Sequence, residues 1–157
     1  GNAQVQTENM TNPTDGKDKI GHFQILSENG DSLIDYGPFD AGTGRYFGFS
    51  AGRNNWIDYA SNGNLKQTVD LPGNLHTNPI AIKGLNISRL MTISNKLNSN
   101  PGSYNFLLNS CSSVASRALA ASGYFAIGGI HPYLLRASIY LREIGFRPSI
   151  FSHFLNN

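Results

Sequence analysis

Two short apolar segments on either side of Asn29-Gly30 constrain the fold of this chain more than any other feature. Residues 19–26 and 32–36 have the length and the β-branched and aromatic content of strands. Asn-Gly between them predicts a hairpin with a two-residue type I′ turn, because both central residues of that turn need a positive φ. Apolar side chains fall on both faces of this hairpin, so we expect it to lie in the protein interior.

The pattern of apolar residues changes along the rest of the chain. Short strands are expected around 46–49, 56–59 and 65–70. Later apolar residues recur every three or four positions, which predicts helices at 88–100, 111–123 and 132–145 and a short one after Pro148. Strands thus precede helices, as in an α+β fold with a small antiparallel sheet packed against helices.

Domain organisation is indicated by the polar N-terminal segment. Residues 1–17 show no apolar periodicity, and we expect a linker or a disordered segment there. Residues 18–157 then form a single domain, which is long enough to bury a core.

Composition narrows the function classes. Charged residues make up 14% of the 157 residues and the net charge is +2, with no run of Lys and Arg dense enough to indicate nucleic-acid binding. No apolar run reaches the length of a membrane span, and no signal peptide is visible. Because the chain begins with Gly, we expect a C-terminal piece of a larger protein that is secreted or delivered into a target cell.

The single cysteine, Cys111, ends a polar loop and begins a helix of small residues. A thiol at a helix N-terminus faces unpaired backbone N–H groups and the positive end of the helix dipole, and both favour the thiolate. One cysteine cannot form an internal disulfide, and a cysteine-based zinc site is not expected. Cys111 is therefore a candidate nucleophile, and the alternative is a small buried side chain of the core.

The hairpin offers partners for this thiol. A two-residue turn places Gln24 opposite Asp35, so that His22 and Asp35 are diagonal neighbours on one face. A catalytic base needs this arrangement, with one imidazole nitrogen turned toward the nucleophile and the other held by a carboxylate. Tyr36, the next residue along the strand, is the alternative orienting group.

The order and spacing of these segments resemble a known family. A strand at 21–26 that carries His22, a polar residue about a dozen positions later, and the run 104–111 before a helix are similar to the circularly permuted NlpC/P60 papain-like superfamily. That superfamily includes lecithin:retinol acyltransferase-like proteins and C-terminal domains of bacterial effectors and polymorphic toxins. The resemblance implies a permuted papain-like fold with Cys111 as nucleophile, His22 as base and Asp35 as the third residue.

The same resemblance implies a function. It indicates a cysteine hydrolase or acyltransferase that needs no cofactor and no metal and that cleaves amide bonds of peptidoglycan stem peptides or proteins. A lipid-directed acyltransferase or phospholipase with the same Cys–His pair is the alternative. An antibacterial effector or toxin of this kind would have a cognate immunity protein as partner. Two positions depart from the family pattern, since Ser110 stands where asparagine is frequent and Asp35 where histidine is common.

Other patterns have competing interpretations. Residues 48–52 match the G-x-S-x-G motif of serine hydrolases, but residues 53–56 are a poor helix start, and we expect a turn. His131, just before Pro132, is expected at a helix cap rather than in a metal site. Residues 133–141 are apolar almost all round, which favours a core helix over a membrane-contacting surface. The alternative to an enzyme is a non-catalytic binding domain in which Cys111 is buried.

Overall fold

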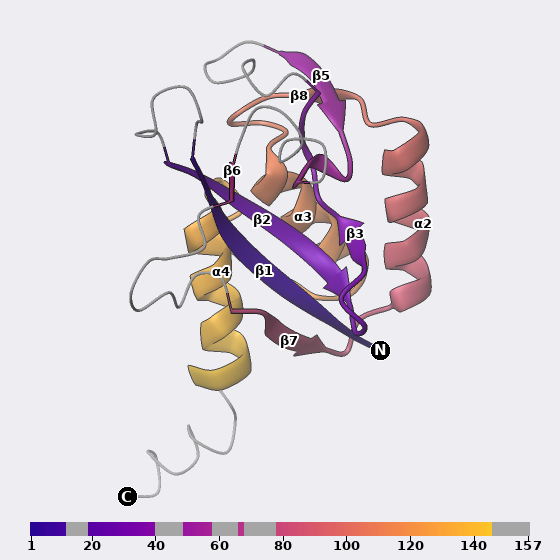
Figure 1. Cartoon of the computed structure of the whole chain (residues 1–157). Coiled ribbons are helices and arrows are strands. Elements are labelled where there is room, and N and C mark those ends of the chain that lie inside the picture. The colour runs from indigo at the N-terminus through magenta and orange to yellow at the C-terminus, as the bar shows by residue number, and fades with distance from the viewer. Residues whose placement is uncertain (12–18, 40–48, 58–65, 68–77, 146–157) are drawn as a thin grey trace, which may run out of the picture.

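The computed structural model describes residues 1–11, 19–39, 49–57, 66–67 and 78–145 (Figure 1). Its main sheet is antiparallel and is built around two long strands, β1 (Asn2–Thr11) and β2 (Lys19–Ser27). The strand order is β3 (Ser32–Ile34), β2, β1 and β6 (Lys66–Gln67), and β7 (Ile80–Lys83) pairs with the first residues of β1. A second sheet contains β4 (Gly37–Pro38), β5 (Ser50–Arg53) and β8 (Ser103–Tyr104).

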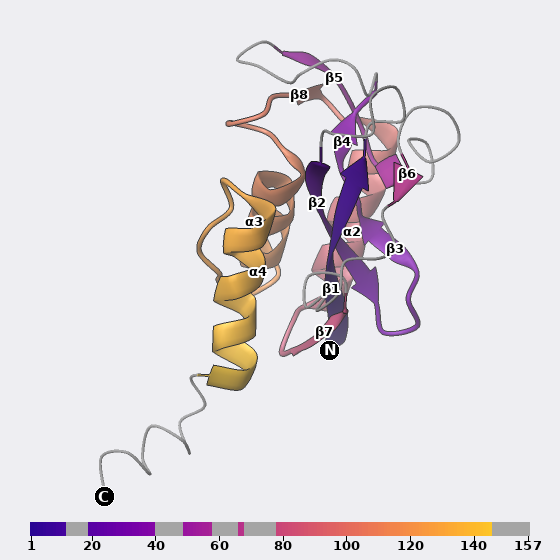
Figure 2. The same cartoon turned by 60° about the vertical axis from the view of Figure 1, so that its left-hand side comes forward.

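Helices pack on this sheet, as Figure 2 shows. They are α2 (Ile87–Ser99), α3 (Cys111–Ala121) and α4 (Pro132–Tyr140), the last continued by a π-helical turn, η1 (Leu141–Gly145). α3 and α4 contact β2 and β1 from one side, while α2 contacts β3. Within the described ranges, every helix is too short or too polar to span a bilayer.

The predicted α+β class is confirmed, with small antiparallel sheets packed against helices. The three long predicted helices are also confirmed, and α3 ends at the predicted position before Gly123. Two alanines of α3, Ala115 and Ala118, are buried in the core beside Phe23 and Ile25 of β2. Small side chains at these positions let α3 pack closely against the strand that carries His22.

The prediction of a linker or disordered segment at 1–17 is wrong for its first part. Residues 2–11 form β1, which lies between β2 on one side and β6 and β7 on the other. Ala3, Val5 and Thr7 are buried and alternate with more exposed glutamines, the period of two expected of a strand. Residues 12–18 lie outside the described ranges.

The predicted hairpin forms, but its turn differs from the predicted one. The N–H of Gly30 donates to the carbonyl of Ser27 at 3.0 Å, and the N–H of Ser27 donates to the carbonyl of Asp31 at 2.7 Å. Gly30 has a φ of 89°, whereas Asn29 is not in the left-handed region. The type I′ prediction is therefore wrong, and a three-residue loop with glycine in its left-handed position joins the strands.

A β-bulge then restores the predicted register. Leu26 pairs with Ser32, one position away from the predicted partner, but Ile25 pairs with Ile34 as predicted. Leu33 is the extra residue that absorbs the difference. Asp35, directly after the paired residue Ile34, therefore lies at the end of the hairpin that carries His22.

The shorter predicted strands have mixed outcomes. The strand at 65–70 is confirmed in part as β6. The strand at 56–59 is wrong for Trp56 and Ile57, which are helical, and its other residues lie outside the described ranges. Residues 46–48 and the segment after Pro148 also lie outside them, and Phe49 directly precedes β5.

Candidate active site

Cys111 is the first residue of α3 and is buried. The serines around it cap the helix: Ser113 N–H donates to Ser110 Oγ at 3.3 Å, and Ser110 N–H donates to Ser113 Oγ at 2.7 Å. The N–H of Val114 donates to the Ser110 carbonyl. Among the described hydrogen bonds, the first-turn N–H groups of Cys111 and Ser112 have no acceptor. These two donors can stabilise negative charge beside the thiol.

The loop before Cys111 is ordered by its two asparagines. Asn105 Oδ1 accepts hydrogen bonds from the N–H groups of Leu107 at 3.0 Å and Leu108 at 2.9 Å. The backbones of Asn105 and Asn109 form an isolated antiparallel bridge. Arg117, in the middle of α3, donates to the Leu108 carbonyl and to Asn109 Oδ1. The polar residues of the 104–111 motif therefore fix the approach of the chain to Cys111.

The structure brings His22 and Asp35 to this thiol. His22 Nε2 is hydrogen-bonded to Asp35 Oδ1, and both side chains are buried. Cys111 lies close enough to His22 for the thiol to contribute to the raised pKa of His22. Since Asp35 occupies Nε2, Nδ1 is the ring nitrogen left for the sulfur. The three predicted site residues thus meet in one buried cluster.

This environment changes the protonation of His22. Burial lowers its pKa, but the charge and the hydrogen bond of Asp35, with a smaller contribution from Cys111, raise the pKa of His22 to about 10. His22 therefore carries its proton at neutral pH, beside a carboxylate on one nitrogen and the sulfur on the other. An imidazolium in this position stabilises a thiolate.

The same proton makes folding stability depend on pH. The folded pKa of His22, about 10, lies above the ordinary value of 6.5, so the folded protein holds a proton that the unfolded chain releases between these values. The resulting stabilisation is fully present below pH 6.5 and is lost as the pH rises through about 10. We expect the free energy of unfolding to fall by up to about 1.4 kcal/mol per pH unit in this window, as measured by urea titration.

A matched pair of variants tests this assignment. His22→Gln is expected to remove the slope, and His131→Gln is expected to keep it, because His131 is an exposed residue at the start of α4. A wild-type slope no steeper than that of His22→Gln would contradict the raised pKa.

The segment 54–57 holds Asp35 in place. Asp35 Oδ2 accepts from the N–H of Ile57 at 2.9 Å, and its carbonyl accepts from the N–H of Trp56 at 3.0 Å. The N–H of Asp35 donates to Asn54 Oδ1 at 2.8 Å. Asn54 in turn donates to the Leu33 carbonyl and to Asn98 Oδ1 on α2. The sequence analysis did not identify Asn54, and nothing in this asparagine-rich chain distinguishes it from its neighbours.

Trp56 covers the histidine. Its ring lies 4.6 Å from the His22 ring, centroid to centroid, with an interplanar angle of 40°. Its Nε1–H donates to the Pro38 carbonyl at 2.9 Å. A Cβ on Gly37 would overlap the Trp56 ring, so only glycine leaves space for the indole there. The apolar cover reduces the solvation of the His22–Asp35 pair and strengthens their interaction.

Tyr36 does not orient the histidine. Its hydroxyl donates to the Pro101 carbonyl at 2.6 Å and accepts from Asn109 Nδ2 at 3.3 Å. Asp35 is thus the hydrogen-bond partner of His22. Tyr104 lies closer to the thiol: burial, the charge of Cys111 and Tyr36 together raise the pKa of Tyr104, so its hydroxyl stays protonated. The sequence analysis did not single out Tyr104, although it begins the 104–111 motif.

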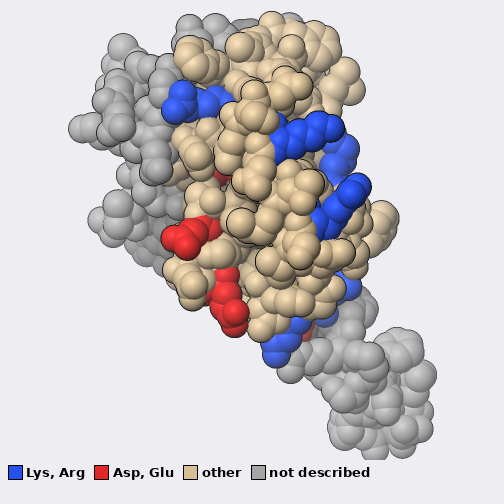
Figure 3. Space-filling view, turned by 90° about the vertical axis from the view of Figure 1, so that its right-hand side faces the viewer, with Lys and Arg blue, Asp and Glu red and all other residues tan. Residues whose placement is uncertain are grey.

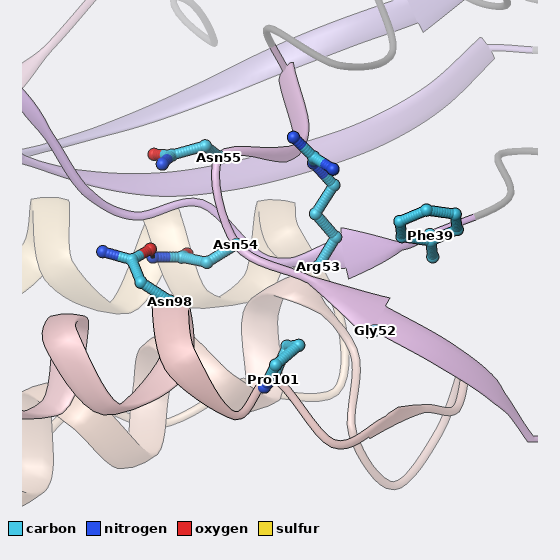
Figure 4. Close-up of a pocket in the computed structure, with 7 residues that line it drawn as sticks. All are labelled: Phe39, Gly52, Arg53, Asn54, Asn55, Asn98 and Pro101. Carbon is cyan, nitrogen blue, oxygen red and sulfur yellow. Dashed lines mark hydrogen bonds between the residues drawn. The ribbon is translucent and has the colours of Figure 1, made fainter.

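A pocket of about 270 Å³ lies next to the supporting segment (Figure 4). It is lined by Phe39, Gly52, Arg53, Asn54, Asn55, Asn98 and Pro101. The candidate nucleophile, base and carboxylate are not among these residues. Asn54 connects the pocket with the candidate active site, because it lines the pocket and also binds the backbone of Asp35.

The competing site patterns do not form sites in the described structure. Ser50 of the G-x-S-x-G match begins β5, so it lies within a strand, neither at the expected turn nor at the strand-to-helix elbow that a serine nucleophile needs. His131 caps α4 as predicted, accepting from the N–H of Tyr133 at 3.1 Å. The described residues contain no group of three or more His, Cys, Asp and Glu side chains able to hold a metal ion.

The geometry can support nucleophilic chemistry at a carbonyl carbon, with a cysteine sulfur, an imidazolium and two free N–H donors at one helix end. Comparison of the chain with models of known families, with curated proteins and with solved structures gave no match.

Proposed function

We propose that the chain is a cysteine hydrolase or acyltransferase that acts on amide bonds through an acyl-enzyme intermediate. One observation carries the proposal: Cys111, at the N-terminus of α3, lies beside the buried, hydrogen-bonded pair of His22 and Asp35. A cysteine that served only to fill the core would need no charged partner. A buried ion pair without a function is also costly to maintain, since desolvation opposes it.

The reaction uses the groups in sequence. The Cys111 thiolate attacks the carbonyl carbon, and the N–H groups of Cys111 and Ser112 stabilise the developing oxyanion. His22 passes the Nδ1 proton to the leaving amine, the C–N bond breaks, and a thioester remains on Cys111. Water or another acceptor then loses a proton to Nδ1 and attacks the thioester, which releases the acid or the transferred acyl product and restores the thiolate and imidazolium pair. Asp35 keeps the ring orientation and stabilises its positive charge throughout.

The resemblance to the permuted NlpC/P60 papain-like superfamily supports the amide substrate and the biological setting. On that basis the substrates are peptidoglycan stem peptides or proteins, and the protein acts as an antibacterial effector or toxin delivered into a target cell, with a cognate immunity protein. The reaction as written needs no cofactor.

Product analysis tests this function. Wild-type protein is expected to release stem peptides from purified peptidoglycan, and Cys111→Ser is expected to reduce the rate by about 1,000-fold or more, because a hydroxyl is a much weaker nucleophile than a thiolate here. Mass spectrometry identifies the new termini. His131→Gln serves as the control and should match the wild type.

Phospholipid vesicles, assayed in parallel, separate the lipid-directed alternative. Release of fatty acid without release of stem peptides would replace the amide substrate by a lipid ester. Equal rates for the wild type and Cys111→Ser on every substrate would overturn the cysteine mechanism.

A further inference from the structure

An apolar surface lies on the outer side of α3, near the end that carries Cys111. We call it the apolar face; its members are all large, apolar and exposed: Phe106, Leu107, Leu108, Ile127, Ile130 and Leu134. Leu108, Ile127 and Ile130 are each 68–69% exposed. Isolated exposed apolar residues are common, but a cluster at loop ends indicates a binding surface.

Contacts on α3 bring the two loops of this face together. Arg117 donates to the Leu108 carbonyl at 3.2 Å, which fixes the 105–109 loop to the outer side of the helix. A Cβ on Gly129 would lie 2.8 Å from Ser116 Cβ, so the loop after α3 packs against Ser116. Ser116 is next to Arg117 in α3, so both loops contact the same part of the helix. Figure 2 shows both loops projecting on the side of α3 and α4.

The loops are held in fixed shapes. Asn105 ties the first loop by accepting two backbone hydrogen bonds. In the second loop the N–H of Ile127 donates to Ser138 Oγ at 3.0 Å, and Arg142 donates to the Phe125 carbonyl at 2.6 Å. The apolar side chains are therefore presented to solvent by ordered loops, so little conformational entropy is lost when they are buried.

Charge around the face identifies its partner. Two exposed basic residues lie at the loops of this face: Arg117 binds the Leu108 carbonyl and Arg142 binds the Phe125 carbonyl. Figure 3, the view from the α2 side, shows acidic side chains mainly on the left and basic ones at the upper left, toward the right and at the lower end. Projecting apolar side chains beside basic groups match the interface of an anionic bilayer, where apolar residues enter the acyl region and Lys and Arg meet the headgroups.

We propose that the apolar face docks the protein on anionic phospholipid membranes, with the N-terminal end of α3 close to the bilayer surface. The proposal does not rest on the proposed reaction, because it concerns binding alone. It assigns a surface and a partner that the Cys111 site does not require.

Vesicle co-sedimentation of the 157-residue chain carrying Cys111→Ser tests the proposal without any turnover. Binding is expected to be at least about tenfold stronger to phosphatidylcholine vesicles containing roughly one-third phosphatidylglycerol than to pure phosphatidylcholine, and to weaken as salt is raised. Adding Leu108→Ser and Ile130→Ser is expected to lower the affinity for the anionic vesicles by about tenfold or more, since two exposed apolar side chains lose their burial. Adding Phe49→Ser, an equally exposed change next to β5, should leave it unchanged.

Three other results of this experiment would each overturn the proposal. Equal binding of all variants would place the contact elsewhere, and absence of vesicle binding by the Cys111→Ser parent would exclude a membrane partner. If the Leu108→Ser, Ile130→Ser variant changed only the mass measured by light scattering, the face would be an interface with a second copy of the chain. Circular dichroism confirms that the variants remain folded.

Discussion

His22→Gln is expected to slow alkylation of Cys111 by iodoacetamide at about pH 6 by roughly 10- to 100-fold. The imidazolium of His22 lies beside Cys111 and keeps its proton up to about pH 10, so it stabilises negative charge on the sulfur in acidic solution. Without it, the rate should fall about tenfold per pH unit below about 8.5, as for an ordinary thiol. Wild-type labelling should change little over the same range.

The labelling experiment must separate the access of iodoacetamide to the Cys111 sulfur from the charge on that sulfur. Cys111 is buried, so the rate is compared at about pH 10 too, where an ordinary thiol is ionised and the difference between wild type and His22→Gln should shrink. His131→Gln provides the control with an unrelated histidine removed. If the wild type had the pH profile of an ordinary thiol, or reacted only after unfolding, Cys111 would be a core residue and the proposed function would be lost.

The placement of His22 and Asp35 shows how a local error can leave a site prediction intact. The sequence analysis placed both residues on one face through a two-residue turn, yet the loop has one residue more. The bulge at Leu33 compensates for that residue, and the predicted pairing returns at Ile25 and Ile34. The hairpin is buried on both faces, and this burial requires the predicted pairing to return. A shift of one residue would exchange the side chains of the two faces.

β1 was missed for a different reason. Its apolar residues are few, and its glutamines and threonines resemble a polar linker when read without a partner. The strand is stable because β2, β6 and β7 pair with it on both edges and Val5 is fully buried. Strand pairing over such sequence separations leaves little local signal.

The helix that begins at Cys111 could be predicted because its signals are local. Ser110 and Ser113 form the capping box and Gly123 comes just after the last turn, so both ends are marked in the sequence itself. The support of Asp35 by Asn54 and Ile57 could not be predicted, because these contacts join residues about twenty positions apart through a loop.

Replacing Asp35 separates the charge at the site from its geometry. In Asp35→Ala, His22 Nε2 and the N–H of Ile57 lose their acceptor inside the protein, which is expected to cost about 3–5 kcal/mol of stability and to reduce turnover by about 100-fold or more. Asp35→Asn keeps one oxygen, which can still accept from His22 Nε2, so the ring orientation should survive, whereas the N–H of Ile57 loses its acceptor. The substitution removes the negative charge that raises the pKa of His22.

The pH profile of Asp35→Asn is therefore the decisive measurement. The wild type should lose activity on the alkaline side near pH 10, as His22 gives up its proton, and Asp35→Asn should lose it at least about one pH unit lower. Tyr36→Phe is the matched control, because the Tyr36 hydroxyl binds Pro101 and Asn109 and not the histidine. If Tyr36→Phe moved the alkaline limb and Asp35→Asn did not, the roles assigned to these neighbouring residues would be reversed.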